Sequence, residues 1–293
     1  MNNIQANWLK IVGIIVLVIL IAFVTVKFTS RSQNQKGSVY TGVVNSGTIR
    51  SCYSVYPPYL IKDPNTGKLS GIFYDIVNKA SENMGLQVDW NAEISFGELV
   101  EALNSNRCDI VGSGIWPNSA RGKSADFTVP VFYAPLHAYV RANDFRFDNN
   151  YRIANDSKYT ISTIDGETAQ IVAKNQFPNA KTVQLPQLTD VSQMLLNVAD
   201  GKADMTFAEP AFANLYIKNN PGKIKSVSAS KPVVAYGSTI ILKKGEVELR
   251  SSLDTALTEL LNNGYIDQLL DNYEKEYPSG ILRVGAPYAI PAK

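Results

Sequence analysis

The amino-acid sequence predicts an α/β protein of two parallel-sheet lobes, preceded by an N-terminal transmembrane helix. Three observations support this prediction. Apolar segments with strand character alternate with amphipathic helical segments over most of the chain. The alternation falls into two successive strand–helix–strand–helix–strand groups, each of which is typical of one parallel sheet. A sixteen-residue uncharged apolar run lies near the N-terminus.

The apolar run lies between Lys10 and Lys27 and reads IVGIIVLVILIAFVTV. As a helix it would cover about 24 Å, slightly less than a bilayer core of about 30 Å, and the flanking lysine stems extend its reach. A cleavable signal peptide is the alternative, but the small-x-small cleavage site is missing from the following VKFTSRSQ. We therefore expect residues 1–28 to form a cytoplasmic tip and an uncleaved transmembrane signal anchor. The polar residues 29–45 are expected to form a tether.

The periodicity of the remaining chain predicts the elements of both lobes in order. The first lobe is expected to contain strands at 48–55, 86–90 and 108–114, a helix at 71–85, and a helix opened by the capping box of Ser95 and Glu98. The second lobe is expected to contain strands at 159–164, 181–185 and 203–209 and helices at 166–177, 190–201 and 211–220. A strand at 239–245 and helices at 248–264 and 265–277 follow.

The composition is that of an ordinary globular protein. The 293 residues are 45% hydrophobic and carry a formal net charge of +2, which leaves ample length for two packed cores. The near-neutral charge argues against a nucleic-acid partner. The single histidine, His137, argues against a histidine-based metal site, so we expect no metal and no cofactor.

The two cysteines are expected to be free buried thiols. Cys52 falls on the first strand of the first lobe, near its ligand end, and Cys108 falls on the third strand, near the opposite end. Because neighbouring parallel strands point the same way, this placement separates the two sulfur atoms and argues against a disulfide.

Aromatic and charged residues follow the predicted strands. In open parallel sheets, ligands bind beyond the carboxyl ends of the strands. In the first lobe the strands lead into YPPY (residues 56–59) and into a loop that carries Trp116 and Arg121. In the second lobe they end at Ile164 and Glu209. We therefore expect a ligand site with a cation at one lobe and an acid at the other.

Four stretches of the chain resemble the family 3 solute-binding proteins of polar amino-acid ABC transporters. They read YPPYLIKDPNTGKLSGIFYDIVNKASENMG, LVEALNSNRCDIVGSGIWPNSARGKSADFTVPVFY, STIDGETAQIVAK and GKADMTFAEPAFANLYIKNN, and they follow the family's order. The resemblance implies a type II, periplasmic-binding-protein-like fold whose strand-like hinges lie near 131–138 and 234–239. Lobe one would comprise 46–132 plus 239–276, lobe two 133–238, and the C-terminal tail 277–293.

The resemblance also implies a ligand site between the lobes. Arg121 would bind both oxygens of the ligand α-carboxylate, helped by backbone donors near Thr168. Glu209 would hold the α-ammonium, where the family usually has Asp. The other expected contacts come from aromatic walls and from the end of the third strand. The full predicted set is Tyr53, Tyr56, Phe96, Ser113, Gly114, Trp116, Arg121, Ile164, Thr168 and Glu209.

Two further departures from the family pattern affect the expected ligand. Tyr53 stands where the family often has Asp, and Trp116 stands where a small hydroxyl residue is usual. These changes remove a charge and a hydroxyl group and add aromatic area. They predict a pocket that is more apolar than one built for a basic amino acid.

We therefore expect a monomeric, non-enzymatic protein at the cell membrane. It would capture an amino acid or a similar small carboxylate between its lobes and deliver it to an ABC transporter permease. One alternative is a cyclohexadienyl or prephenate-type dehydratase with Glu209 as general acid. Another is the ligand-sensing subunit of a signalling complex. The basic residues after the apolar run favour a cytoplasmic location for the lobes, but we expect an extracytoplasmic one because ligand capture for uptake takes place outside.

Overall fold

The computed structural model describes residues 38–278 and 280–285. The expected transmembrane anchor at 1–28 and most of the expected tether at 29–45 lie outside this part of the chain. None of the helices in the described part is sufficiently long and apolar to span a bilayer. Residues 39–45, the last part of the expected tether, belong to helix α2 (Val39–Ser46). The architecture below is that of the compact unit that starts at Val43.

The first lobe is a sheet with helices packed on it. Its parallel strands lie in the order β4 (Gln87–Glu93), β1 (Thr48–Tyr53) and β5 (Ile110–Ile115). The second half of β12 (Val234–Lys243) adds an antiparallel strand beside β5, and β6 (Ala125–Phe127) pairs with β12. The helices are α3 (Ile72–Asn83), α4 (Leu99–Asn104), α9 (Val247–Asn262) and α10 (Tyr265–Glu276). A short hairpin of β2 (Ile61–Lys62) and β3 (Leu69–Ser70) precedes α3.

The sheet of this lobe lies between α3 on one face and α4 on the other, and neighbouring residues of β5 face these two helices in turn. Gly112 faces α3, and a Cβ atom there would lie 3.0 Å from Val77. Val111 and Ile115 face the other way and join a buried apolar cluster with Leu99 of α4. This period of two is that of a strand covered on both faces.

The second lobe repeats the arrangement with a second sheet. Its parallel strands lie in the order β10 (Met205–Ala208), β8 (Thr160–Ile164) and β9 (Lys181–Leu185). The second half of β7 (Phe132–Arg141) pairs antiparallel with β10, and β11 (Ile224–Ser226) also pairs with β7. Helices α6 (Thr168–Gln176), α7 (Ser192–Ala199) and α8 (Pro210–Asn219) pack on this sheet, and a 3-10 turn, η1, covers Tyr151–Ala154.

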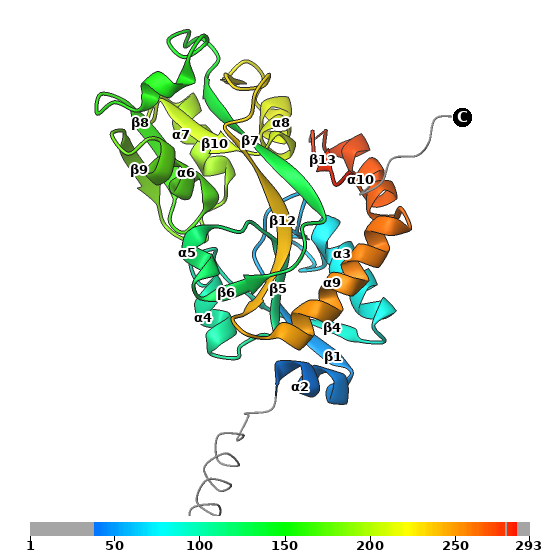
Figure 1. Ribbon diagram of the computed structural model, residues 1–293. Coiled ribbons are helices and arrows are strands. Elements are labelled where there is room, and N and C mark those ends of the chain that lie inside the picture. The colour runs from blue at the N-terminus through cyan, green and yellow to red at the C-terminus, as the bar shows by residue number, and fades with distance from the viewer. Residues whose placement is uncertain (1–37, 279, 286–293) are drawn as a thin grey trace, which may run out of the picture. The chain divides into compact units, whose positions relative to one another are not determined.

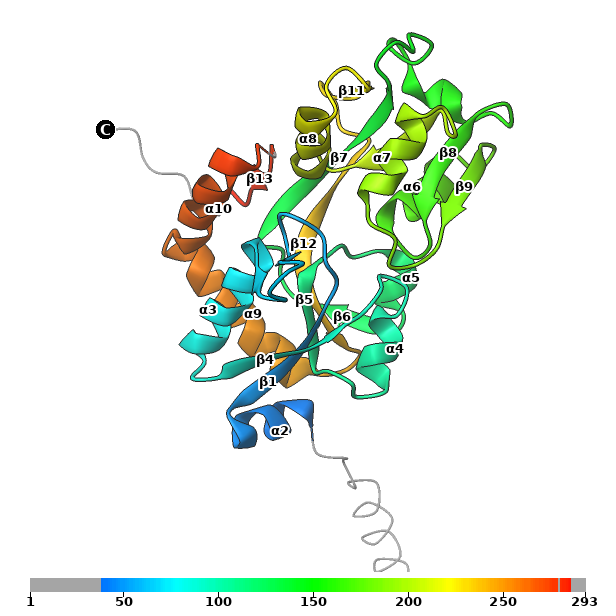
Figure 2. The ribbon, with the colours of Figure 1, turned by 180° about the vertical axis from the view of Figure 1, so that it is seen from behind.

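The two ten-residue strands β7 and β12 run side by side from one lobe to the other (Figures 1 and 2). Residues 132–136 of β7 pair antiparallel with residues 234–238 of β12. Each strand then continues into a different sheet, β7 beside β10 and β12 beside β5. The paired segments coincide with the segments predicted as hinges, while the exact lobe boundaries stay a prediction.

Part of the predicted C-terminal tail is a third strand at this crossing. β13 (Leu282–Arg283) pairs antiparallel with Tyr133 and Phe132 of β7. The Arg283 guanidinium forms ion pairs of 2.8 Å with Asp271 and Glu274 of α10. The end of the described chain is therefore fastened both to the crossing strands and to lobe one.

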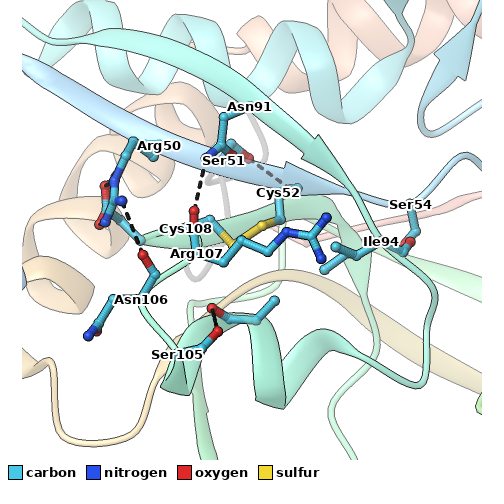
Figure 3. Close-up of a disulfide and its surroundings, with 12 residues drawn as sticks. Arg50, Ser51, Cys52, Ser54, Asn91, Ile94, Ser105, Asn106, Arg107 and Cys108 are labelled. Carbon is cyan, nitrogen blue, oxygen red and sulfur yellow. Dashed lines mark hydrogen bonds and ion pairs between the residues drawn. A yellow bond between two sulfur atoms is a disulfide. The ribbon is translucent and has the colours of Figure 1, made fainter.

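Cys52 and Cys108 form a disulfide, so the prediction of two free thiols is wrong (Figure 3). That prediction placed them at opposite ends of neighbouring strands. In the structure Cys52 is in register with Val111, and Cys108 lies before β5 begins, where the chain passes below β1. Their Cα atoms are 5.6 Å apart, a separation that a disulfide can bridge.

Hydrogen bonds hold the segment around Cys108 against the sheet. Arg50 Nη1 donates to the Asn106 carbonyl at 3.1 Å, and Asn91 Nδ2 donates to the Arg107 carbonyl at 2.9 Å. The segment is thus tied to β1 and β4 before it enters β5. The position of Cys108 follows from this tertiary contact and not from the strand pattern.

Candidate functional site

A small cavity lies between the two lobes, beyond the ends of their parallel strands. Its volume is about 20 Å³, little more than the space for one water molecule. Lobe one supplies Tyr56, Tyr59, Phe96, Ser113, Gly114, Ile115, Trp116 and Arg121, and lobe two supplies Glu167, Thr168 and Glu209. The lobes are therefore closed on each other, and a larger ligand requires them to separate or a lining side chain to move.

The cavity brings together eight of the ten residues predicted as ligand contacts. These are Tyr56, Phe96, Ser113, Gly114, Trp116, Arg121, Thr168 and Glu209. Ile164 lines a neighbouring groove instead. Tyr53 lies outside the cavity, where its ring meets the edge of Trp90 with centroids 6.3 Å apart.

Three lining residues, Tyr59, Ile115 and Glu167, were not predicted. Tyr59 belongs to the YPPY segment, and Glu167 stands between Gly166 and Thr168, so both stood in stretches that the sequence already singled out. The hydroxyl group of Tyr59 is buried and has no hydrogen-bond partner in the described part of the chain. This hydroxyl group is therefore available to form a hydrogen bond with a molecule in the cavity.

Arg121 lies in the short helix α5 (Ser119–Gly122), which follows β5. The Asn118 side chain caps this turn by accepting from the Arg121 backbone N–H at 2.9 Å. The guanidinium donates to the carbonyl groups of Trp116 at 3.3 Å and Phe96 at 3.5 Å in lobe one. It also donates to the Gly166 carbonyl of lobe two at 3.1 Å. Burial lowers the pKa of Arg121, and the nearby Glu167 carboxylate partly opposes this change.

Two residues at the end of β5 shape the lobe-one wall. Gly114 has a φ of 72°, and a Cβ atom there would lie 2.6 Å from the ring of Phe73. Only glycine therefore fits at this strand exit. The Ser113 hydroxyl oxygen accepts from the Ser54 backbone N–H at 2.8 Å, which ties the ends of β5 and β1 together.

Glu209 projects into the cavity from lobe two, immediately before Pro210 opens α8. Its side chain is buried, and the Tyr56 hydroxyl group donates a hydrogen bond to its Oε2 atom across the lobes. Burial raises the pKa of Glu209 to about 8, and the charge of Glu167 adds to this effect, although the Tyr56 hydrogen bond acts in the opposite direction. Burial likewise raises the pKa of Tyr56 well above its usual value. In the closed form Glu209 thus holds its proton more tightly than in water, and a ligand cation placed beside it would favour the charged carboxylate.

Glu167 is the N-cap residue of α6. Its Oε2 atom accepts a hydrogen bond of 2.6 Å from the Ala169 backbone N–H. The side chain is buried. Burial raises the pKa of Glu167 to about 7, while hydrogen bonds from the backbone of Ala169 and Thr168 and the charge of Arg121 act in the opposite direction. Glu167 therefore places a second carboxylate group at the cavity.

The lobes touch directly beside the cavity. Gly166 has a φ of 77°, and a Cβ atom there would lie 2.6 Å from the Gly97 backbone nitrogen. The Ser95 hydroxyl group donates to Gln187 Oε1 at 2.6 Å, and Gln187 Nε2 donates to Asp165 Oδ2 at 3.0 Å. These contacts join the loop after β4 to the loops after β8 and β9.

A wider groove of about 590 Å³ adjoins the cavity and is also lined by both lobes. It shares Phe96 and Glu167 with the cavity. Other carboxylates line it as well, and one of them, Glu93, forms a 2.7 Å ion pair with Lys62. Among the described residues, no group of three or more His, Cys, Asp or Glu side chains could hold a metal ion.

Two α/β lobes whose strand ends face one another, with a guanidinium on one side and carboxylates on the other, define a two-lobe ligand-binding protein. The sequence pattern of the bacterial extracellular solute-binding proteins, family 3, matches residues 49–276. The chain belongs to this family, which confirms the resemblance found in the sequence.

The chain is similar in sequence or fold to several amino-acid-binding proteins. An L-arginine-binding protein of Pseudomonas aeruginosa is 25% identical over 229 residues, which are 75% of this chain and 85% of that protein. A probable histidine-binding protein of Campylobacter jejuni is 22% identical over 225 residues, or 75% of this chain and 82% of that protein. The crystal structure of the ancestral amino acid-binding protein AncCDT-1, a precursor of cyclohexadienyl dehydratase, has a TM-score of 0.70 at 22% identity. The superposed region covers 81% of this chain and 99% of the AncCDT-1 chain. This similarity confirms the two-lobe fold.

Proposed function

We propose that the protein captures an amino acid between its lobes, outside the cytoplasm, and delivers it to an ABC transporter permease. One observation carries this proposal. Arg121 of lobe one and Glu209 of lobe two line the same cavity, although they are far apart in the sequence. A zwitterion carries the two complementary charges, and neither lobe alone offers both a guanidinium and Glu209 to it.

Ligand capture follows from this division between the lobes. A molecule that contacts both lobes stabilises the closed form over the open form by its extra contacts, and the crossing strands β7 and β12 allow the change. The closed form then presents one joint surface of both lobes to the permease. An open form without ligand lacks that surface.

The disulfide supports an extracytoplasmic location. Disulfides persist in oxidising compartments and are rare in the cytosol. Cys52 and Cys108 are both buried beside α4, in the core of lobe one. The apolar run before Lys27 would hold the lobes at the membrane on that side.

A binding screen tests the proposed capture. The full chain, purified in mild detergent, is mixed with each of the twenty amino acids, and its melting temperature is measured. A ligand at 100 times its dissociation constant stabilises the folded state by about 2.7 kcal/mol, so a binder gives a clear upward shift. The same ligand should fail to stabilise Arg121→Ala while still stabilising Lys123→Ala, whose exposed lysine follows Arg121 by two residues and does not line the cavity. No shift with any amino acid would contradict the proposal.

Delivery to a permease needs a cellular test. Cells that lack this gene should lose uptake of the identified amino acid, and the wild-type gene should restore uptake. The Arg121→Ala gene should not restore it. Full uptake in the deletion strain would refute the transport role without affecting the binding result.

One observation favours an enzyme as a second candidate. A buried Glu209 whose raised pKa favours the protonated form near pH 7, hydrogen-bonded to Tyr56 and lining the same cavity as Phe96, is suited to act as a general acid on an aromatic precursor. Incubation with prephenate or arogenate should then yield an aromatic product, and Glu209→Gln should abolish it. No product from the wild-type protein leaves capture as the only function supported.

A further inference from the structure

The cavity holds more negative than positive groups. Its charged side chains are Arg121, Glu167 and Glu209, which makes one guanidinium against two carboxyl groups. A zwitterion would balance Arg121 with its carboxylate and one glutamate with its ammonium group. The second glutamate would remain without a cation, so it would either keep its proton or be an unpaired buried carboxylate, which is unfavourable.

Glu167 occupies the position where a ligand carboxylate would approach. Its own carboxylate accepts from the Ala169 N–H, at the end of α6 that attracts anions. The neighbouring Arg121 guanidinium already donates to three carbonyl groups, including that of Gly166. A ligand carboxylate would therefore meet a like charge, and it would share a guanidinium that already makes three hydrogen bonds.

At the side of the cavity where a ligand ammonium group would bind, the surroundings favour a cation. Glu209 is held by a hydroxyl donor, Tyr56, and Glu167 is close enough for its charge to act on Glu209. A cationic group placed between the two glutamates would satisfy both. The adjoining groove continues the negative lining, with Asp63, Asp165 and Asp190.

We infer that Glu167 is a specificity-determining residue, which disfavours the carboxylate of a ligand and selects ligands with an excess of positive charge. This inference rests on the proposed ligand site. It assigns to the site a ligand class that carries one more cationic group than carboxylates, as basic amino acids and their decarboxylated amines do. This departs from the more apolar pocket expected from Tyr53 and Trp116, of which only Trp116 lines the cavity.

The test compares pairs of ligands that differ only in the α-carboxylate. Arginine and agmatine, lysine and cadaverine, and tyrosine and tyramine are titrated calorimetrically into the full chain at pH 8. The variants are Glu167→Gln, which keeps the shape and removes the charge, and Glu167→Ser, which keeps a capping oxygen for α6. Glu101→Gln, an exposed acid of α4, is the matched control.

The measured quantity is the affinity ratio of each acid to its amine. For Glu167→Gln and Glu167→Ser we expect this ratio to rise at least about tenfold over wild type, while Glu101→Gln leaves it unchanged. Loss of helix capping alone would weaken both members equally and leave the ratio constant. A ratio within about threefold of wild type in both variants overturns the inference and leaves the proposed function standing. If no amino acid and no amine binds the wild-type protein, the proposed function itself fails and this inference fails with it.

Discussion

Replacing Gly166 by alanine should open the closed protein. Gly166 has a φ of 77°, and the added Cβ atom would lie 2.6 Å from the nitrogen and 2.7 Å from the Cα of Gly97 on the other lobe. Both contacts are with backbone, which cannot rotate away as a side chain can. The clash exists only while the lobes touch, so it penalises the closed form alone.

Gly85 provides the matched control, because it isolates the cost of the backbone conformation. It has a φ of 71°, and a Cβ atom added there would have no other atom within 4 Å. Alanine at either glycine costs about 1–2 kcal/mol for a left-handed conformation, in both open and closed forms. Only Gly166→Ala adds the overpacking cost, about 1–3 kcal/mol. This difference lowers the closed-to-open ratio, and with it the ligand affinity, by about 5- to 150-fold.

Small-angle X-ray scattering and calorimetric titration measure the two effects. At a ligand concentration that closes the wild-type protein, Gly166→Ala should have a larger radius of gyration than wild type, and Gly85→Ala should match wild type. Ligand affinity should fall for Gly166→Ala only. Equal radii and equal affinities in the two variants would show that the contact between Gly166 and Gly97 does not define the closed form.

Three further changes have definite expected outcomes. Arg121→Ala should weaken ligand binding by at least about 30-fold in calorimetry, because a charge-assisted contact is lost, and equal affinities in Arg121→Ala and Lys123→Ala would contradict this. Reducing the Cys52–Cys108 bridge, which spans a sequence separation of 56, should lower the free energy of unfolding by about 4 kcal/mol in urea titrations. Coincident curves with and without reductant would refute a stabilising bridge. The pKa of Glu209 is raised on folding to about 8, so its stabilising contribution is complete below the unfolded pKa of about 4.5 and is lost as the pH rises toward 8. Glu209→Gln should therefore reduce the fall in unfolding free energy between pH 5 and pH 8, and an unchanged slope would argue against a raised pKa.

The sequence predicted a helix or strand well wherever the apolar residues of that element followed one regular spacing along its whole length. The helix expected over 71–85 is α3 (Ile72–Asn83), because its apolar face packs on one sheet and Gly85 ends the turn. The strand expected at 239–245 begins five residues earlier, at Val234. Its first half pairs with β7 between the lobes, so its burial follows no single sheet face and gives no clear alternation.

The candidate site could be predicted only as far as strand ends and family positions determine it. Arg121 and Glu209 follow buried strands, and the cavity contains both. Glu167 was not predicted as a ligand contact because nothing local shows that its side chain folds back onto its own helix and into the cavity. The bridge between Cys52 and Cys108 was missed for a similar reason, since it depends on how the segment before β5 is held against β1.

The position of β13 has a practical consequence for work on this protein. The strand lies on β7 beside the pairing of β7 with β12, so movement of the lobes must bend a three-stranded ribbon. Arg283 anchors that third strand to α10. Deletions or fusions at the carboxyl terminus would therefore change the stiffness of the joint itself, and reporter groups for binding measurements belong on the outer helices of either lobe.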